Sequence, residues 1–311
     1  MKTGSKLTAF AKYAWIVLAF NILVILWGVF LRASKSGDGC GQFWLTCNGE
    51  VIPSAPELKT VIEFSHRLTS GIAFIAVLAL LIWTFRKFEK GHPIRKTALV
   101  SFIFIITEAL VGAGLVLTGN TSDSLTAARP FWAIGHLTNT FILLAFLSLT
   151  AWYAGGGRQP ISLNSEPKTL ILLGLAVIAL FLVGTSGSVA ALSSMLFPSA
   201  SVGEGIAKDF ADSSHPLLRL RLSHPLLSII TSVYLIFLAG WLKRQSDDDH
   251  AVAYWSNILS VLILVQIAFG ALTLLTLGPI AMQLGHLFLA EVVWISFVLL
   301  SANFLGNQKP V

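Results

Sequence analysis

The chain has 311 residues, of which 55% are hydrophobic and 12% charged, and its mean hydropathy is +0.78. A soluble domain carries roughly twice that charged fraction, so the composition excludes an ordinary soluble protein. The apolar runs are long and continuous rather than alternating, which excludes a transmembrane β-barrel and predicts helical spans in lipid.

These runs predict an all-α membrane protein with eight transmembrane helices, each close to the roughly 20 residues that a bilayer requires. In chain order, the spans cover residues 13–31, 61–85, 97–118, 130–153, 169–191, 221–242, 251–275 and 281–303. The first resembles a signal peptide, but it is long for one and no small-residue cleavage site follows it, so we interpret it as a retained span. Gly278-Pro279 separates the last two spans, because such a pair ends a helix and starts a turn.

The net charge of +6 does not indicate a nucleic-acid partner, because the cations follow the predicted membrane topology. Of the 21 lysines and arginines, 13 fall on one alternate set of loops and tails. The side of a membrane protein richer in cations is usually cytoplasmic, so we expect both termini inside. No transit peptide is visible, which favours a multi-pass protein of a bacterial plasma membrane with the lipid bilayer as its main solvent.

The chain also contains an internal repeat of four spans. Ser65-His66 matches Ser223-His224 and residues 108–112 match 266–270, both offset by 158, and Gly135-His136 matches Gly285-His286, offset by 150. The repeat predicts two pseudo-symmetric four-helix bundles as domains, residues 1–157 and 158–311. Four spans in each half preserve the membrane orientation, so we expect the two bundles to be parallel.

Four histidines recur at matching places, in the second and fourth spans of each half: His66 and His136, then His224 and His286. All four are predicted within about two helical turns of the outer ends, or ~10 Å. A pair of neutral imidazoles across a helix bundle suits haem iron, whereas zinc would require more ligands for each site. His215 competes with His224, but only His224 keeps the repeat offset. We therefore predict one haem site in each half.

The residue three positions before the first histidine of each half differs between the halves. Glu63 precedes His66, and Arg221 precedes His224. Residues three apart share a helix face, so one half has a carboxylate beside its iron ligand and the other has a guanidinium. A carboxylate there can act as a base or stabilise positive charge, and an arginine can bind a haem propionate. This difference predicts chemistry in the N-terminal half and a permanent electron-transfer haem in the C-terminal half.

Other charged residues leave alternatives open. Glu63 is equally explained as a carboxylate at a helix N-terminus, where the helix dipole favours it. Glu108 and Glu291 lie in the middle of spans and fit either a proton path or a neutral acid hydrogen-bonded between helices. Further propionate candidates are Arg67, Arg129 and Arg219, and snorkelling toward lipid headgroups explains them equally well.

The first outer loop is glycine-rich and aromatic between Gly37 and Gly49, and it contains the only two cysteines, Cys40 and Cys47. They enclose a short loop in a compartment that permits disulfides, so a disulfide between them is feasible. Such a pair fits either a structural staple over the N-terminal bundle or a redox-active pair near a substrate.

Together these residues resemble the heme A synthase family, over nearly the whole chain. The resemblance rests on the two four-helix halves, the Cys40…Trp44…Cys47 loop, Glu63-Phe-Ser-His66-Arg67, and the Gly-His pairs of the fourth and eighth spans. Leu45 departs from the family pattern, since related loops tend to read Trp-Pro. We expect this change to alter the shape of the loop rather than the chemistry.

The resemblance implies an oxidoreductase that converts heme O to heme A for cytochrome oxidase. Two successive hydroxylations of the C8 methyl would give a gem-diol, which loses water to leave a formyl group. The implied ligands of substrate heme O are His66 and His136, and those of a heme b cofactor are His224 and His286. The resemblance also implies that Glu63 is needed for activity, and that heme O synthase and a membrane electron acceptor are partners.

Two rival functions also use haem-binding histidines. One is a b-type cytochrome that carries electrons across the membrane with two permanent haems, and the other is a haem exporter or chaperone. Both would place ligands toward both membrane faces, whereas all four predicted ligands lie near the outer face. The sequence leaves open whether the chain forms a homo-oligomer.

Overall fold

The computed structural model describes residues 7–157, 161, 166–247 and 249–307. These residues form α1 (Ala9–Ala33), α2 (Leu58–Lys87), α3 (Pro93–Leu117), α4 (Arg129–Ala154), α5 (Pro167–Leu196), α6 (Val202–Phe210), α7 (Pro216–Arg221), α8 (Ser223–Gln245), α9 (His250–Leu275) and α10 (Ile280–Asn307). The β-type pairing among them is an isolated bridge between Cys47 and Glu50. The predicted all-α class is confirmed for the described part of the chain.

Eight helical stretches, with Pro216–Gln245 counted as one, are long and apolar enough to cross a membrane. The eight predicted spans are thereby confirmed in number and order. The helices extend past the predicted bounds, since α2 begins at Leu58 and α5 continues to Leu196. Hydropathy reports the thickness of the hydrocarbon layer, whereas a helix can continue into the polar interface on either side.

Local sequence signals set several helix ends. The Thr8 hydroxyl accepts a hydrogen bond from the Ala11 amide at 3.2 Å and caps α1. Between α9 and α10, Leu277 and Gly278 adopt left-handed conformations, with φ of 61° and 62°, directly before Pro279. This tight turn is the one that Gly278-Pro279 predicts, because glycine accepts a positive φ and proline does not continue a helix.

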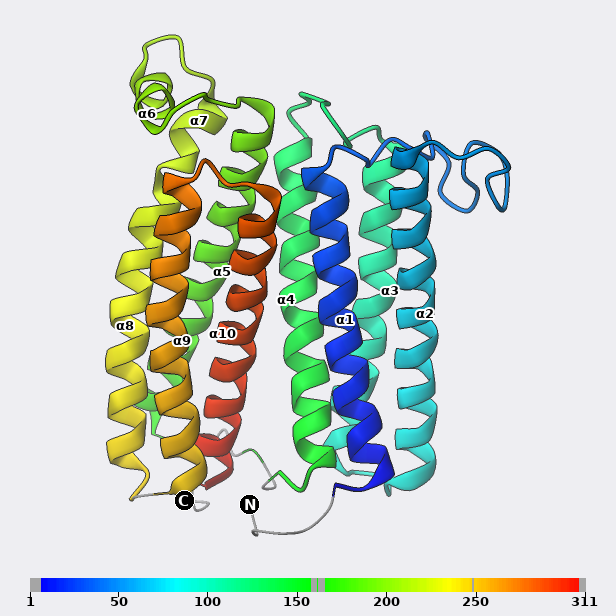
Figure 1. Cartoon of the computed structure of the whole chain (residues 1–311). Coiled ribbons are helices and arrows are strands. Elements are labelled where there is room, and N and C mark those ends of the chain that lie inside the picture. Colours follow the sequence, from blue (N-terminus) through cyan, green and yellow to red (C-terminus); the bar gives the residue numbers. More distant parts are fainter. Residues whose placement is uncertain (1–6, 158–160, 162–165, 248, 308–311) are drawn as a thin grey trace.

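The long helices lie in two groups side by side (Figure 1). Helices α1 to α4 contact one another in sequence and α1 also contacts α4, while α5, α8, α9 and α10 form the second group. Contacts between the groups come from α1 and α4 on one side and α5 and α10 on the other. The pseudo-symmetry between the groups stays a prediction, and the predicted boundary after residue 157 adjoins residues 158–160, which lie outside the described residues.

Aromatic side chains fill the contact between the two groups. The rings of Phe141 on α4 and Trp294 on α10 stack with centroids 5.5 Å apart, and the Trp294 indole donates to the Phe141 carbonyl at 2.7 Å. Nearby, the Trp152 indole donates to the side-chain oxygen of Asn303 at 3.3 Å. Both tryptophan N–H groups are therefore satisfied in an apolar interior, where an unpaired donor would be costly.

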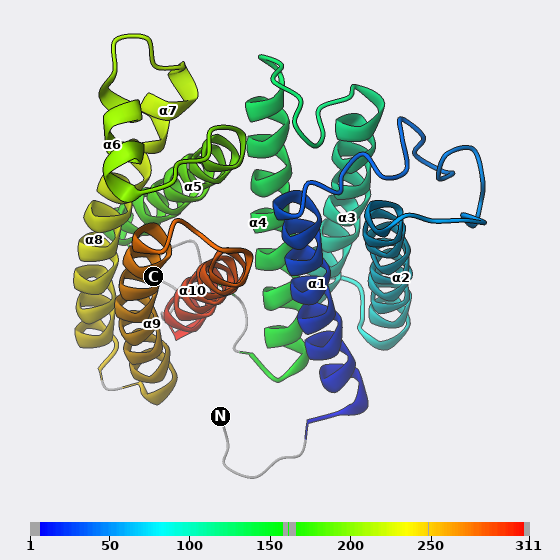
Figure 2. The same cartoon turned by 45° about the horizontal axis from the view of Figure 1, so that its top comes forward.

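The two long predicted outer loops lie at one end of the molecule. Figure 2 shows the loop 34–57 extending beyond α2, and α6 and α7 standing beyond α5 and α8. The opposite end carries the start of α1 and the described members of the cation-rich set, which are Lys12, Arg86, Lys87, Lys90, Arg95, Lys96, Lys168, Lys243 and Arg244. Lys2, Lys6, Arg158 and Lys309 lie outside the described residues. That this end is cytoplasmic stays a prediction.

Candidate functional site

The four predicted histidines all lie toward the end of the molecule that carries the loop 34–57 and α6. His66 is eight residues from the start of α2 and His136 is seven from the start of α4, distances of about 12 and 10 Å along the helices. His286 is six residues from the start of α10. His66 is therefore slightly deeper than the predicted two turns, because α2 begins three residues before the predicted span.

In the C-terminal half, His224 of α8 faces His286 of α10. Their ring centroids are 6.3 Å apart and their planes meet at 85°. The Nδ1 atom of His224 lies 3.2 Å from the Val183 carbonyl oxygen and 3.3 Å from the Ser186 hydroxyl. A hydrogen bond at Nδ1 fixes the tautomer and leaves the lone pair of Nε2 for a metal. The Nδ1 atom of His286 is buried without a hydrogen-bond partner.

The separation of these two rings fits a single iron bound between them. Two metal–imidazole bonds of about 2 Å each would take up about 4 Å of the distance between the ring centres. The centroid distance of 6.3 Å then leaves about 1 Å on each side from the ligating nitrogen to its ring centre, which an imidazole supplies. The described residues contain no group of three or more His, Cys, Asp or Glu side chains that could hold a metal. Two histidines are a donor set that fits haem iron, whose remaining ligands come from the porphyrin.

A glycine lies against three of the four imidazoles. A Cβ atom added to Gly28, Gly187 or Gly270 would fall 2.9 Å from the Cε1 atom of His66, His224 or His286, respectively. These glycines belong to α1, α5 and α9, the neighbours of the histidine-bearing helices. The space beside each ring admits a hydrogen atom but not a methyl group. Glycine thus allows each ring to lie directly against the adjacent helix.

In the N-terminal half, His66 lies on α2 and His136 on α4, each near the start of its helix. The Nδ1 atoms of both rings are buried and lack an aligned hydrogen-bond partner. The His136 Nδ1 atom nevertheless lies 3.3 Å from Oε1 of Glu108, which is within ion-pair distance. His224 and His286 therefore face each other, whereas the pairing of His66 with His136 stays a prediction, and the second histidine of each half has different surroundings.

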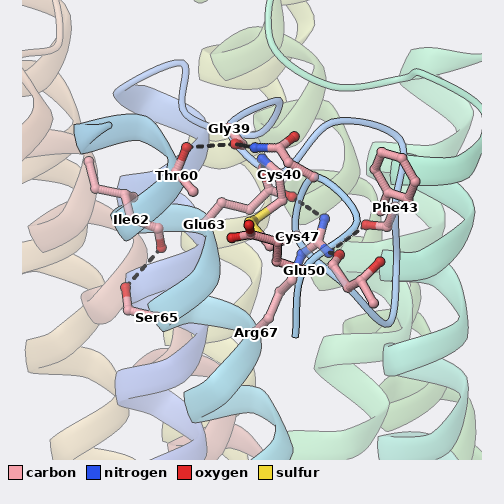
Figure 3. Close-up of a disulfide and its surroundings, with 12 residues drawn as sticks. Gly39, Cys40, Phe43, Cys47, Glu50, Thr60, Ile62, Glu63, Ser65 and Arg67 are labelled. Carbon is pink, nitrogen blue, oxygen red and sulfur yellow. Dashed lines mark hydrogen bonds and ion pairs between the residues drawn. A yellow bond between two sulfur atoms is a disulfide. The ribbon is translucent and has the colours of Figure 1, made fainter. Parts of the chain in front are cut away.

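Glu63 lies at the junction between the outer loop and α2 (Figure 3). Its carboxylate is buried, with 3% exposure, and accepts a hydrogen bond from the Cys40 amide at 2.9 Å. The other carboxylate oxygen accepts from Arg67, one helical turn later. The Thr60 hydroxyl donates to the Gly39 carbonyl at 2.7 Å and holds the same part of the loop. That Glu63 lies near the histidine pair stays a prediction. Its contact with the outer loop is a finding that the sequence alone does not give.

Arg67 holds the rest of this loop against α2. Its guanidinium donates to the carbonyl oxygens of Trp44 at 3.2 Å and Thr46 at 3.0 Å, and also to that of Phe43. Three loop carbonyls and one carboxylate therefore share this cation, which the loop needs because carbonyls turned inward require donors. The propionate role predicted for Arg67 stays a prediction, and its observed contacts are with the protein.

Cys40 and Cys47 form a disulfide inside this loop, and both residues are buried, with 0% and 1% exposure. Redox-active disulfides tend to be exposed, so the burial favours the structural staple over the redox-active pair. The Cys40 amide that binds Glu63 belongs to the same closed ring of the chain. The disulfide thus restricts the segment that meets the Glu63 carboxylate.

We expect the double variant Cys40→Ser/Cys47→Ser to destabilise the loop 34–57 by about 2 to 3 kcal/mol, the amount that closing a loop of this length contributes. Limited proteolysis in detergent micelles would then cleave this loop faster than in the oxidised wild type. Glu50→Gln, a change in the same loop that keeps both sulfurs, serves as the control. Equal cleavage rates for the wild type and the double variant would contradict the staple.

Arg221 ends α7, and Leu222 separates it from α8. Its Nε atom lies 2.6 Å from Asp209 of α6, and Nη2 donates to the Gly205 carbonyl at 3.0 Å. Leu222 keeps right-handed helical backbone angles, with φ of −65° and ψ of −25°, so Arg221 and His224 stay on one helical stretch, as the sequence predicts. The guanidinium is held by α6, and its contact with a propionate stays a prediction.

The other arginines considered for propionates also hold outer loops. Arg129 donates to the carbonyls of Ser122 and Ser124, and Arg219 donates to that of Asp212 at 3.1 Å. A single sequence does not reveal such clamps, because the carbonyl acceptors carry no residue signature. Asp209 was missed for a related reason, since nothing in the sequence links this acid to an arginine twelve residues away.

His215 takes a structural place rather than a place in a histidine pair. Its Nδ1 atom accepts the Leu217 amide at 3.2 Å and caps α7, and its ring packs on Phe197. His224 is the residue that faces His286. The repeat offset, which selects His224 from the sequence, thus agrees with the arrangement of the rings.

Comparison with known proteins identifies the family of this chain. A family model described as cytochrome oxidase assembly protein matches residues 11–298, which is most of the chain. The chain belongs to the heme A synthase family. A member named heme A synthase, from Bacillus cereus, is 27% identical over 284 residues, which cover 89% of this chain and 88% of that protein. The resemblance inferred from the histidines and the Cys loop is confirmed.

Two more similar relatives have a different name. Proteins of two Thermus thermophilus strains, both named protoheme IX farnesyltransferase, are 44% and 43% identical over 295 residues. The match covers 95% of this chain but only 48% of each of those proteins. The chain therefore spans about half the length of these curated relatives of the family.

Proposed function

We propose that this chain is an oxidoreductase that converts heme O to heme A by oxidising the C8 methyl group of the porphyrin to a formyl group. The observation that carries the proposal is the pairing of His224 with His286, whose rings are separated by the distance that one iron requires. The internal repeat places His66 and His136 at the matching positions of the other group. Membership in the heme A synthase family supports the same reaction. All four histidines lie at one end of the molecule, which disfavours haems stacked across the membrane.

In this proposal the C-terminal half holds heme b as its cofactor. His224 and His286 would ligate its iron, and Ser186 and the Val183 carbonyl would keep the His224 ring oriented through Nδ1. Bound heme b supplies a one-electron carrier that can pass electrons onward to an acceptor in the membrane. The apolar helices exclude water from the iron, which is one way in which a protein tunes such a carrier.

The N-terminal half would bind substrate heme O through His66 and His136. Conversion of the methyl to a formyl group removes four electrons and four protons when the incoming oxygen is counted as water. Loss of electrons builds positive charge on the ring, which a buried carboxylate can stabilise. Glu63 would supply this charge, and the Cys40 amide and Arg67 would hold the carboxylate in one orientation. The same carboxylate can accept a proton released by the methyl group.

The supplier of the substrate is proposed to be a farnesyltransferase acting on protoheme. Heme O carries a farnesyl tail, and the Thermus thermophilus relatives are named for transfer of that group to protoheme IX. This chain matches only about half of their length. The unmatched half of those proteins is a natural place for the named activity, so we propose that this chain acts beside such an enzyme in a bacterial plasma membrane.

We expect Gly187→Ala to weaken heme b binding about tenfold or more, a loss typical of residues that orient a metal ligand. The added methyl would fall 2.9 Å from His224 Cε1 and displace the ring. Gly174→Ala is the matched control on the same helix, because a Cβ atom there meets nothing within 4 Å. Haem content of the purified variants, measured by pyridine haemochrome spectra, distinguishes them. Equal haem content would contradict the assignment of His224 as a ligand.

The proposed reaction is tested by expressing the chain with a supply of heme O and separating the extracted pigments by chromatography. We expect heme A to accumulate, with the hydroxylated intermediate at early times. If the purified chain holds heme b and binds heme O but leaves it unchanged when an electron acceptor is present, the proposed reaction is wrong. That outcome would favour a b-type cytochrome or a haem chaperone.

A further inference from the structure

A polar cluster surrounds the base of His136 in the N-terminal group. Thr140 donates to Oε1 of Glu108 at 2.6 Å, and Asn139 donates to Oε2 of the same carboxylate. Thr107 in turn donates to the side-chain oxygen of Asn139 at 2.5 Å. His136 completes the cluster, with its Nδ1 atom 3.3 Å from Oε1 of Glu108. Three residues on one face of α4, namely His136, Asn139 and Thr140, therefore contact the carboxylate of Glu108 on α3.

The corresponding positions of the C-terminal group are almost entirely apolar. The repeat offsets pair Thr107 with Val265, Glu108 with Gln266, Asn139 with Leu289, and Thr140 with Ala290. Gln266 donates to the backbone carbonyl of His286 at 3.1 Å, and its amide nitrogen lies 3.5 Å from Nε2 of that ring. The third span of each half thus contacts the second histidine, through Glu108 at Nδ1 of His136 and through Gln266 at Nε2 and the carbonyl of His286. A negatively charged side chain at this position is present only in the N-terminal half, where Glu108 replaces the neutral Gln266.

We propose that Glu108 is a positioning residue for His136 that makes this imidazole a stronger electron donor to iron than His286. The inference rests on the proposed function, since it requires His136 to ligate substrate heme O. Both carboxylate oxygens receive donors, from Asn139 and Thr140, so the group faces His136 as an acceptor. If Nε2 binds the iron, the remaining ring hydrogen is on Nδ1, which lies within ion-pair distance of Oε1 of Glu108, at 3.3 Å.

The chemical consequence follows from the charge. A negative charge next to Nδ1 raises the basicity of the ring, and a more basic ligand favours the oxidised metal. The substrate iron would then have a lower midpoint potential than the heme b iron, whose His286 faces the neutral amide of Gln266. Electrons would move from the substrate half toward the cofactor half, in the direction that oxidation of heme O requires.

The inference is tested by anaerobic spectroelectrochemical titration of the purified chain, loaded with heme b and then reconstituted with heme O. In Glu108→Gln we expect the midpoint potential of the added heme O to rise and its dissociation constant to increase about tenfold or more, with heme b unchanged. Glu57→Gln, the same chemical change at the exposed N-cap of α2, is the matched control and should leave both potentials unchanged. Glu108→Asp should restore part of the shift.

The reverse change keeps the inference falsifiable if Glu108→Gln does not fold. Gln266→Glu introduces the carboxylate beside His286, and we expect it to lower the midpoint potential of heme b. If heme O binds and is converted by the wild type but neither variant shifts the potential of its own haem, this inference alone is overturned. A wild-type chain that takes up no heme O overturns the proposed function, and this inference with it.

Discussion

Glu63→Gln is expected to reduce heme A formation by about 100-fold or more, the usual effect of removing a charged group that stabilises a transition state. The change preserves the size of the side chain, so the amide oxygen can still accept from Cys40. It removes the negative charge beside Arg67, which the proposed reaction places near the substrate ring. Heme O, or its hydroxylated intermediate, should therefore accumulate while heme b stays bound. Chromatography of extracted pigments measures both outcomes from one preparation.

Glu57→Gln provides the matched control for this prediction. Glu57 lies at the N-cap of the same helix, is exposed, and makes no side-chain hydrogen bond to the helix end. The same chemical change there should leave heme A formation unaltered. Normal heme A production by Glu63→Gln would show that the carboxylate serves only to hold the outer loop.

The second large effect is expected from the histidine pairs. His224→Ala and His286→Ala should each lose most of the bound heme b, because removing one of the two histidines proposed to hold its iron costs more than the 10- to 100-fold typical of a residue that only supports a ligand. His66→Ala and His136→Ala should keep heme b and lose heme O binding. Haem content and absorption spectra of the four purified variants separate these outcomes.

His215→Ala is the informative control for this series, since His215 is the rival ligand in the sequence. Its ring caps α7 and packs on Phe197, so the variant should keep heme b. Equal loss of heme b in all four of these variants would contradict the proposal that only the C-terminal half binds heme b. If only His215→Ala lost heme b, His215 would be the ligand and the assignment of His224 would be wrong.

Much of the fold follows from the sequence because lipid imposes simple rules. Long apolar runs become spans, and Gly278-Pro279 forms the turn that separates the last two. The helix ends were less accurate, as at Leu58, because helices continue beyond the hydrocarbon layer that hydropathy detects. The interruption of the helical hydrogen bonds at Leu222 was not predicted, although Pro225, which has no amide hydrogen to donate to the Arg221 carbonyl, is its sequence signal.

The histidines of the candidate site were predictable because the repeat places them in register. Their surroundings were not, because they depend on contacts between helices. The contact of Glu108 with His136 joins residues 28 positions apart, and only the spatial packing of α3 on α4 brings them together. Glu63 was selected for its spacing to His66, but its anchoring by Cys40 and Arg67 required the path of the outer loop.

The central claim is that one helical group holds a lasting haem and the other a haem that is exchanged. Titration of heme O into the purified chain, with haem counted per polypeptide, tests this claim most directly. We predict one heme b per chain before the titration, and saturable uptake of one heme O that His66→Ala or His136→Ala abolishes. Two haems bound per chain before the titration, or no uptake of heme O during it, would contradict the claim.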